Sequence, residues 1–178
     1  MTTMTDVRYP VGRFQRPSEL SVDDRKVMID QIAEAPAAMR AAVAGLTAVQ
    51  LATPYRDGGW TVQQVVHHLP DSHMNAYSRF KKALTEDNPT ITAFMEDKWA
   101  ELTDSREVPH DVSLTLLEAL HTRWLSVLRS MKASDFARTL FHPEHGQMRL
   151  DDMLALYSWH GRHHVAHVTT LREKGGWR

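Results

Sequence analysis

The sequence predicts an all-α fold, a four-helix bundle. Four long segments carry apolar residues at helical spacing, no segment alternates convincingly as a strand does, and capping residues stand at segment ends. With 178 residues, 42% of them hydrophobic, the chain has the size and composition of one ordinary domain. We therefore expect a single domain over residues 1–178, in which residues 1–20, interrupted by Pro10, Gly12 and Pro17, form an irregular arm.

The first two helices are predicted from their capping residues. Ser21 can cap a first helix that runs toward Val43, and Pro36 inside it is expected to kink it. The pair Thr61–Gln64 has the spacing of a capping box, which starts a second helix that reaches about Thr85.

The last two helices follow a long polar connection, Glu86–Asp111. Its length permits a crossover, and thus a topology other than simple up-down-up-down. We expect a third helix over Ser113–Met131 and a fourth over about Leu150–Lys174, where Gly175 and Gly176 supply a stop signal.

Composition narrows the classes of partner and chemistry. The formal charge is −1, and no run of Lys and Arg favours a nucleic-acid or anionic-membrane partner. Because there is no cysteine, disulfides, thiolate zinc sites and cysteine nucleophiles are excluded. Residues 1–10 contain neither a basic region nor an apolar run, which predicts a cytoplasmic protein. The sequence also contains no H-E-x-x-H, G-x-S-x-G or glycine-rich phosphate motif.

Histidine is the unusual residue, because four of the eleven fall between residues 160 and 167. On an ideal helix, His160 and His164 lie on the core-facing stripe of helix four, one turn apart. This i, i+4 spacing brings two ring nitrogens close enough to share one ion. His163 and His167 have the same spacing, but their pair is centred about 60° off the stripe, so they are second choices.

The simpler interpretation is that these are ordinary polar or hydrogen-bonded histidines. Two buried imidazoles in adjacent turns weaken it, because each ring needs a partner and a shared metal satisfies both. A third ligand is expected from a facing helix, and helix two offers His67, His68 and His73. His73 lies nearest the apolar stripe and His68 on its edge, but Pro70 disturbs the periodicity, so the choice stays open.

Several motifs together resemble those of YfiT-type proteins in the DinB-like superfamily. They are the stretch 53–75, the block Trp159–His167, the arm Tyr9–Gly12 and the terminal Gly176-Trp177. The resemblance spans nearly the whole chain. It implies a four-helix bundle of the DinB/YfiT-like type with a long crossover between helices two and three, usually assembled as a homodimer.

The resemblance also implies a metal site. Matched position by position, its ligands are His68, His160 and His164, which would hold one divalent ion per chain, Zn²⁺ or Ni²⁺, with water completing the shell. One departure is Pro70, where the family usually has a small residue such as alanine.

Three functions are compatible with such a site. Three histidines and open positions favour catalysis over a closed structural site, so we expect a metal-dependent hydrolase that activates water against a small-molecule substrate. Other members of the superfamily resemble low-molecular-weight thiol S-transferases of the bacillithiol or glutathione type. The third possibility is a non-catalytic bundle that binds a metal or a small molecule. Asp71, His73, His163 and His167 are candidates for orienting ligands or moving protons, and no general base is assigned.

Overall fold

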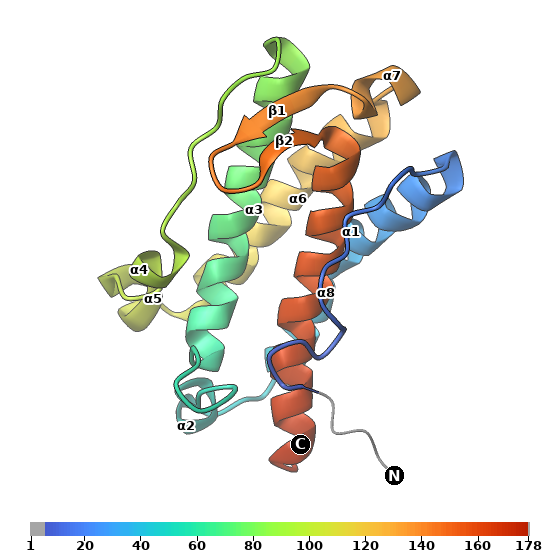
Figure 1. Cartoon of the computed structure of the whole chain (residues 1–178). Coiled ribbons are helices and arrows are strands. Elements are labelled where there is room, and N and C mark those ends of the chain that lie inside the picture. Colours follow the sequence, from blue (N-terminus) through green and yellow to red (C-terminus); the bar gives the residue numbers. More distant parts are fainter. Residues whose placement is uncertain (1–5, 178) are drawn as a thin grey trace.

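Four long helices form the body of the computed structural model, which describes residues 6–177 (Figure 1). They are α1 (Val22–Val43), α3 (Val62–Thr85), α6 (His110–Ser130) and α8 (Leu150–Lys174). Four short helices lie between them: α2 (Ala48–Leu51), α4 (Glu96–Trp99), α5 (Thr103–Glu107) and α7 (Ala133–Phe136). The predicted helical bundle is confirmed. No helix in residues 6–177 is long and apolar enough to cross a membrane.

Three predicted helix boundaries are confirmed, two by capping contacts and one by the backbone turn at a glycine. The Ser21 side chain accepts a hydrogen bond from the Asp24 N–H at the start of α1, at 3.0 Å. Thr61 accepts one from the Gln64 N–H at the start of α3, at 3.2 Å. At the end of α8 the chain turns at Gly176, whose φ of 61° lies in the left-handed region that suits glycine.

The predicted start of the third long helix at Ser113 was wrong by one turn. Pro109 ends the extended connection, and α6 begins directly after it, at His110. The Ser113 hydroxyl does not cap the helix, because it hydrogen-bonds the buried His67 Nδ1 at 2.7 Å. Ser113, which was predicted to cap the helix, instead makes a tertiary contact.

The expectation that the chain contains no strand was also wrong. Strands β1 (Thr139–His142) and β2 (Gly146–Arg149) form an antiparallel hairpin between α7 and α8. Gly146 has a φ of 68° where the turn ends. Each strand has only four residues, too few for alternation to distinguish it from a loop.

The long crossover makes α3 and α6 parallel neighbours (Figure 1). Gln63, at the start of α3, donates to the Arg106 carbonyl just before α6, at 2.8 Å. At the other end, Arg138 lies beyond the end of α6 and donates to the Ala83 carbonyl near the end of α3. Helices α1 and α8 each contact α6 or α3 as well as one another, and the sequence neighbours α1 and α3 lie diagonally opposite.

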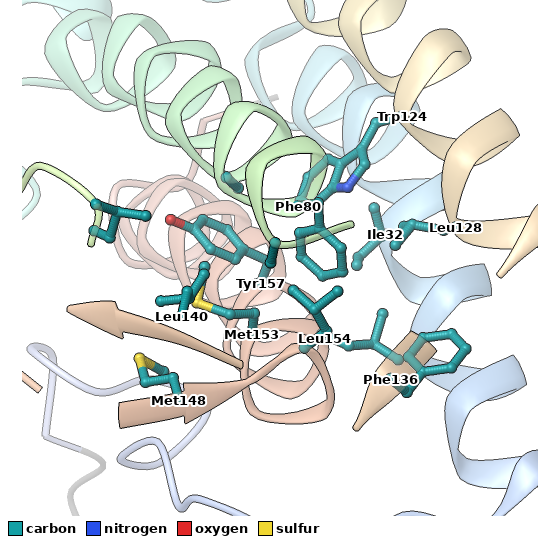
Figure 2. Close-up of a cluster of buried hydrophobic side chains, with 14 residues drawn as sticks. Ile32, Phe80, Trp124, Leu128, Phe136, Leu140, Met148, Met153, Leu154 and Tyr157 are labelled. Carbon is teal, nitrogen blue, oxygen red and sulfur yellow. The ribbon is translucent and has the colours of Figure 1, made fainter. Parts of the chain in front are cut away.

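Two apolar clusters fill the bundle, and a layer of histidines lies between them. One cluster surrounds Phe80, Trp124 and Tyr157, and in Figure 2 the Tyr157 hydroxyl is directed away from the other two rings. The second surrounds Leu69 and Leu117 nearer the other end of the helices. His73 on α3, His121 on α6 and the four histidines of α8 fall between the residues of the two clusters, so a polar layer crosses the bundle.

The expected irregular arm contains neither helix nor strand over residues 6–20, and residues 1–5 of it lie outside the described part. The arm follows α8 in Figure 1. Trp159 donates its ring N–H to the Gly12 carbonyl at 3.0 Å, and the His167 Nε2 lies 3.3 Å from the Arg8 carbonyl. The arm therefore covers the α8 surface beside the histidine layer.

Candidate metal centre

Three histidines from two helices meet in the polar layer. His68 comes from α3, and His160 and His164 stand one turn apart on α8. One ring nitrogen from each lies within 4.8 Å of the other two, and the Nε2 atoms of His68 and His160 are 3.3 Å apart. The structure thus brings together the residues that the resemblance named, including the one from α3 that periodicity left open.

The three rings are held in their neutral form. Burial, followed by the charge of His163, lowers the pKa of His68 to about 3. Burial and the neighbouring histidines hold the pKa values of His160 and His164 well below the ordinary value. A neutral imidazole keeps one nitrogen lone pair, which is the form that binds a metal ion.

The geometry fits a shared ion. Two nitrogens at about 2.0–2.1 Å from a tetrahedral zinc ion would be about 3.3–3.4 Å apart, and the His68 and His160 Nε2 atoms are 3.3 Å apart. The Nδ1 of His164 is buried and has no hydrogen-bond partner among residues 6–177. A buried polar atom without a partner is unfavourable, so an ion bound at this nitrogen would remove that cost.

A chain of hydrogen bonds runs from His160 away from the triad. His160 Nδ1 lies 3.1 Å from His73 Nε2, and His73 Nδ1 lies 2.7 Å from His121 Nε2. His121 Nδ1 lies 2.9 Å from the carbonyl oxygen of Ile32 on α1. Three histidines from three helices are therefore linked to a main-chain acceptor on the fourth.

The Ile32 carbonyl, at the end of this series of hydrogen bonds, fixes which atom donates in each of them. A carbonyl oxygen only accepts, so the neutral His121 carries its proton on Nδ1 and accepts at Nε2 from His73. By the same step, His73 carries its proton on Nδ1 and accepts from His160 Nδ1–H. The His160 lone pair is thereby left on Nε2, the nitrogen that faces His68.

The remaining candidates named from the sequence are not members of the triad, although His163 and His167 line the same cleft. His67 contacts Ser113 and donates from Nε2 to the Val108 carbonyl at 3.0 Å, so it fastens the crossover to α3. His163 stacks on the Trp159 ring. His167 stacks on the Tyr55 ring and contacts the arm.

Asp71, also named as a candidate, lines neither of the clefts that border the triad. Its pKa is raised to about 6, first by burial and then by Asp104.

A second cluster, His142, Glu144 and His145, also has ligand atoms within 4.8 Å of one another, but its chemistry fits an ion less well. The Glu144 main-chain N–H donates to His142 Nδ1 at 3.2 Å. The neutral His142 ring must then carry its proton on Nε2, which leaves no lone pair free for a metal. In the triad, by contrast, hydrogen bonding leaves the lone pair of His160 on the nitrogen that faces His68.

Two clefts give access to the triad. All three histidines line one of about 350 Å³, together with Trp60 and side chains of the arm. His160 also lines a larger cleft of about 650 Å³ that extends toward the hairpin. Glu96 and Asp97, at the start of α4 in the crossover, line both clefts.

Comparison with known proteins places the chain in a family. The family model described as the DinB superfamily matches residues 31–168. The chain belongs to the DinB superfamily. Among solved structures, this superfamily member is similar to YfiT from Bacillus subtilis, described as "a probable metal-dependent hydrolase with an unusual four-helix bundle topology". The two share 44% sequence identity and a TM-score of 0.94, over 97% of this chain and 99% of that one.

Curated relatives agree with the structural match. A protein of Bacillus cereus strain 03BB102, named "Putative metal-dependent hydrolase", is 50% identical over 98% of this chain and 100% of its own length. A protein of Bacillus mycoides strain KBAB4 with the same descriptive name is 49% identical over the same shares. The DinB-superfamily chain is therefore YfiT-like along its whole length, as the sequence motifs predicted.

Pro70, the departure from the family pattern, leaves the α3 scaffold of this DinB-superfamily protein in place. Helix α3 continues through Pro70 from Val62 to Thr85, and His68 in the preceding turn reaches His160.

Sequence reasoning missed residues at the site for two different reasons. His121 carried a signal, because it lies on the apolar stripe of α6 with Leu114, Leu117, Trp124 and Leu128. Glu96 and Asp97 carried none, because only the folded path of the crossover brings them to the clefts.

Proposed function

We propose that this DinB-superfamily protein is a metal-dependent hydrolase that binds one divalent ion, Zn²⁺ or Ni²⁺, through His68, His160 and His164. The observation that carries the proposal is the cluster of three neutral imidazoles with donor atoms within 4.8 Å of one another. Three protein ligands rather than four are typical of a catalytic site, because a position stays open for water or substrate. The names of the relatives support the same activity.

The chemistry divides between the ion and the side chains around it. A bound ion of this kind supplies Lewis acidity, which acidifies water and polarises a carbonyl. The series of hydrogen bonds from His160 to the Ile32 carbonyl holds the His160 ring in one tautomer and orientation. The substrate reaches the triad through the clefts, which are large enough for a small molecule.

Glu96 is our candidate for the proton acceptor. It lines both clefts, and its pKa is raised by desolvation between the cleft walls, then by Asp97 and Glu144. The Glu96 side chain is exposed, so protons can leave the site through it. A carboxylate with a raised pKa is a better base near neutral pH.

A substrate screen on protein reconstituted with zinc or nickel tests the activity. Small esters, amides and lactones are assayed with and without a low-molecular-weight thiol. We expect metal-dependent hydrolysis that is lost in His164→Ala and kept in His163→Ala, a matched change one position away on α8. Turnover only in the presence of thiol would replace hydrolysis by thiol transfer. Saturable ligand binding without any turnover would favour a binding protein.

The assembly is a separate part of the proposal. We propose a homodimer, on the resemblance to YfiT-type proteins alone. Light scattering coupled to size-exclusion chromatography tests it. A mass close to twice the 20.3 kDa of one chain is expected, and a mass close to that of one chain would contradict it.

A further inference from the structure

Arg79 is a buried cation without an anionic partner. It lies on α3, and only 7% of its surface is exposed. Its Nη1 donates to the Tyr157 hydroxyl at 3.2 Å and its Nη2 to the Thr92 carbonyl at 2.9 Å. Both acceptors are neutral, and no carboxylate in residues 6–177 lies within salt-bridge distance of Arg79.

Other arginines in the chain show the contrast. The side chain of Arg25 is more exposed, at 18%, yet it pairs with Asp151 at 2.7 Å. Arg16 and Arg149 share Asp152. A buried charge without a counterion is costly in a folded protein, so the isolation of Arg79 needs an explanation.

Arg79 faces the larger cleft and belongs to a polar line that leads to the triad. It lines the 650 Å³ cleft with Ser72, Tyr157 and His160. The Tyr157 hydroxyl accepts from Arg79, and Ser72 on the same cleft places its Oγ 3.4 Å from His160 Nε2. The charge of Arg79 acts across the cleft, because after burial it is the largest influence that lowers the pKa of His142.

The rest of the cleft favours a particular kind of anion. Phe94, Met153 and Leu156 supply apolar parts of its wall. The carboxylates of Glu96, Asp97 and Glu144 outnumber the cations of Arg79 and Lys98 on the same cleft. They would repel a group with two negative charges more than a group with one. A carboxylate on an aliphatic chain suits these walls, and its two oxygens match the planar guanidinium.

We propose that Arg79 is the anion-binding end of the substrate cleft and that the substrate is a small molecule with an aliphatic chain ending in a carboxylate. The carboxylate binds Arg79, and the hydrolysable bond at the other end of the chain lies at the histidine triad. The assignment of the reacting end rests on the proposed hydrolase function, whereas the anion site rests on Arg79 and its cleft.

A purely structural role for Arg79 provides the control. Arg79 ties the crossover to α3 through the Thr92 carbonyl, and Arg138 makes the same kind of tie through the carbonyls of Ala83 and Glu86. Arg138 does not line the larger cleft. Arg138→Gln therefore removes a similar tie without touching the proposed site.

Titration of the metal-free protein with hexanoate and its neutral analogue hexanamide, followed by NMR, tests the anion site directly. We expect hexanoate to bind at least about tenfold more tightly than hexanamide. Arg79→Gln should abolish the preference, and Arg138→Gln should keep it. A preference that survives in Arg79→Gln, or no preference in the wild type, overturns the proposal. Should Arg79→Gln not fold, the wild type decides: hexanoate must shift the Arg79 Nε–H signal and leave that of Arg138 in place.

A calorimetric titration of the zinc-loaded protein separates this proposal from the hydrolase proposal. The probes are monohydroxamates of dicarboxylic acids of increasing length, each with its methyl ester. At one length of the probe, we expect the free acid to bind about tenfold more tightly than its methyl ester. This preference should be lost when Arg79 is replaced. Esters that bind as tightly as the acids at every length would contradict the anion site and leave the metal site standing. If no hydroxamate binds but hexanoate still binds more tightly than hexanamide, the metal proposal fails and the anion site stands.

Discussion

The tautomer of His160 is set by a series of residues outside the triad. The Ile32 carbonyl orients His121, His121 orients His73, and His73 orients His160. Each step follows from the rule that a neutral imidazole donates from one nitrogen and accepts at the other. His73 and His121 are therefore positioning residues for His160, a proposed metal ligand.

Replacing His121 tests this dependence. Glutamine can accept from His73 and still donate to the Ile32 carbonyl, whereas leucine can do neither. We expect His121→Leu to weaken zinc affinity by about 10–100-fold and His121→Gln to recover most of the loss. Competition with a chromophoric chelator measures both affinities.

The outcome that would contradict the positioning role is equal affinity in both folded variants. Nitrogen-15 NMR of the metal-free wild type adds an independent check, because His160, His73 and His121 should each carry the proton on Nδ1. An Nε2–H form at any of the three would contradict this series of hydrogen bonds.

The sequence predicted one helix of the site better than the other. His160 and His164 follow from i, i+4 spacing on the apolar stripe of α8. Spacing left His67, His68 and His73 open, and all three are buried. His68 differs from the other two in its tertiary contacts: His121 occupies one nitrogen of His73, and Ser113 and Val108 occupy the two nitrogens of His67. Spacing on α3 contains no information about these contacts.

At the scale of elements, the crossover is fastened by buried polar contacts at its end. His67 Nε2–H donates to the Val108 carbonyl, so Nδ1 is left to accept from the Ser113 hydroxyl. Both side chains are buried, and each satisfies the other. This pair joins α3 to the first turn of α6.

Ser113→Ala should therefore destabilise the protein while sparing the site. It leaves the buried His67 Nδ1 without a partner, which costs about 1–3 kcal/mol of unfolding free energy. Urea denaturation of the metal-free protein measures the loss. Zinc affinity should stay within about twofold of wild type, because Ser113 contacts none of the three ligands, and an unchanged urea midpoint would contradict the role.

The sequence predicted helices correctly where their ends depend on neighbouring residues. It failed for the hairpin, which depends on contacts with distant residues. The capping residues of α1 and α3 act within a single turn, so the sequence contains their whole cause. The hairpin depends on distant residues, because Phe141 exchanges main-chain hydrogen bonds with Pro89 and Ile91 of the crossover. No window around residues 139–149 contains that pairing.

At the scale of the whole molecule, the bundle holds an entire layer of histidines in the neutral state. The pKa of His68 is lowered to about 3 and that of His121 to about 4, in each case chiefly by burial. The pKa of His163 is likewise lowered to about 4 by burial and His167. Unfolding exposes these rings to water, where their pKa returns to about 6.5.

Stability of the metal-free protein should consequently fall in acid. Between about pH 4 and 6.5 the unfolded chain binds more protons than the folded one, so the unfolding free energy rises with pH and is fully present above 6.5. Each such histidine contributes up to about 1.4 kcal/mol per pH unit. Asp71 has the opposite effect, because its pKa is raised to about 6 in the folded protein, which therefore binds one more proton there than the unfolded chain.

Urea midpoints measured from pH 7.5 down to 4.5 check the direction. A flat profile, or greater stability in acid, would show that the histidine layer is not held neutral.

The most direct measurement is the metal content of untagged protein by elemental analysis, beside the variant in which His68, His160 and His164 are all alanine. The geometry of the triad predicts about one divalent ion per chain in the wild type and none in the triple variant. Equal content in the two proteins, or none in a wild type given zinc or nickel, would contradict the assignment of these three histidines as a metal centre.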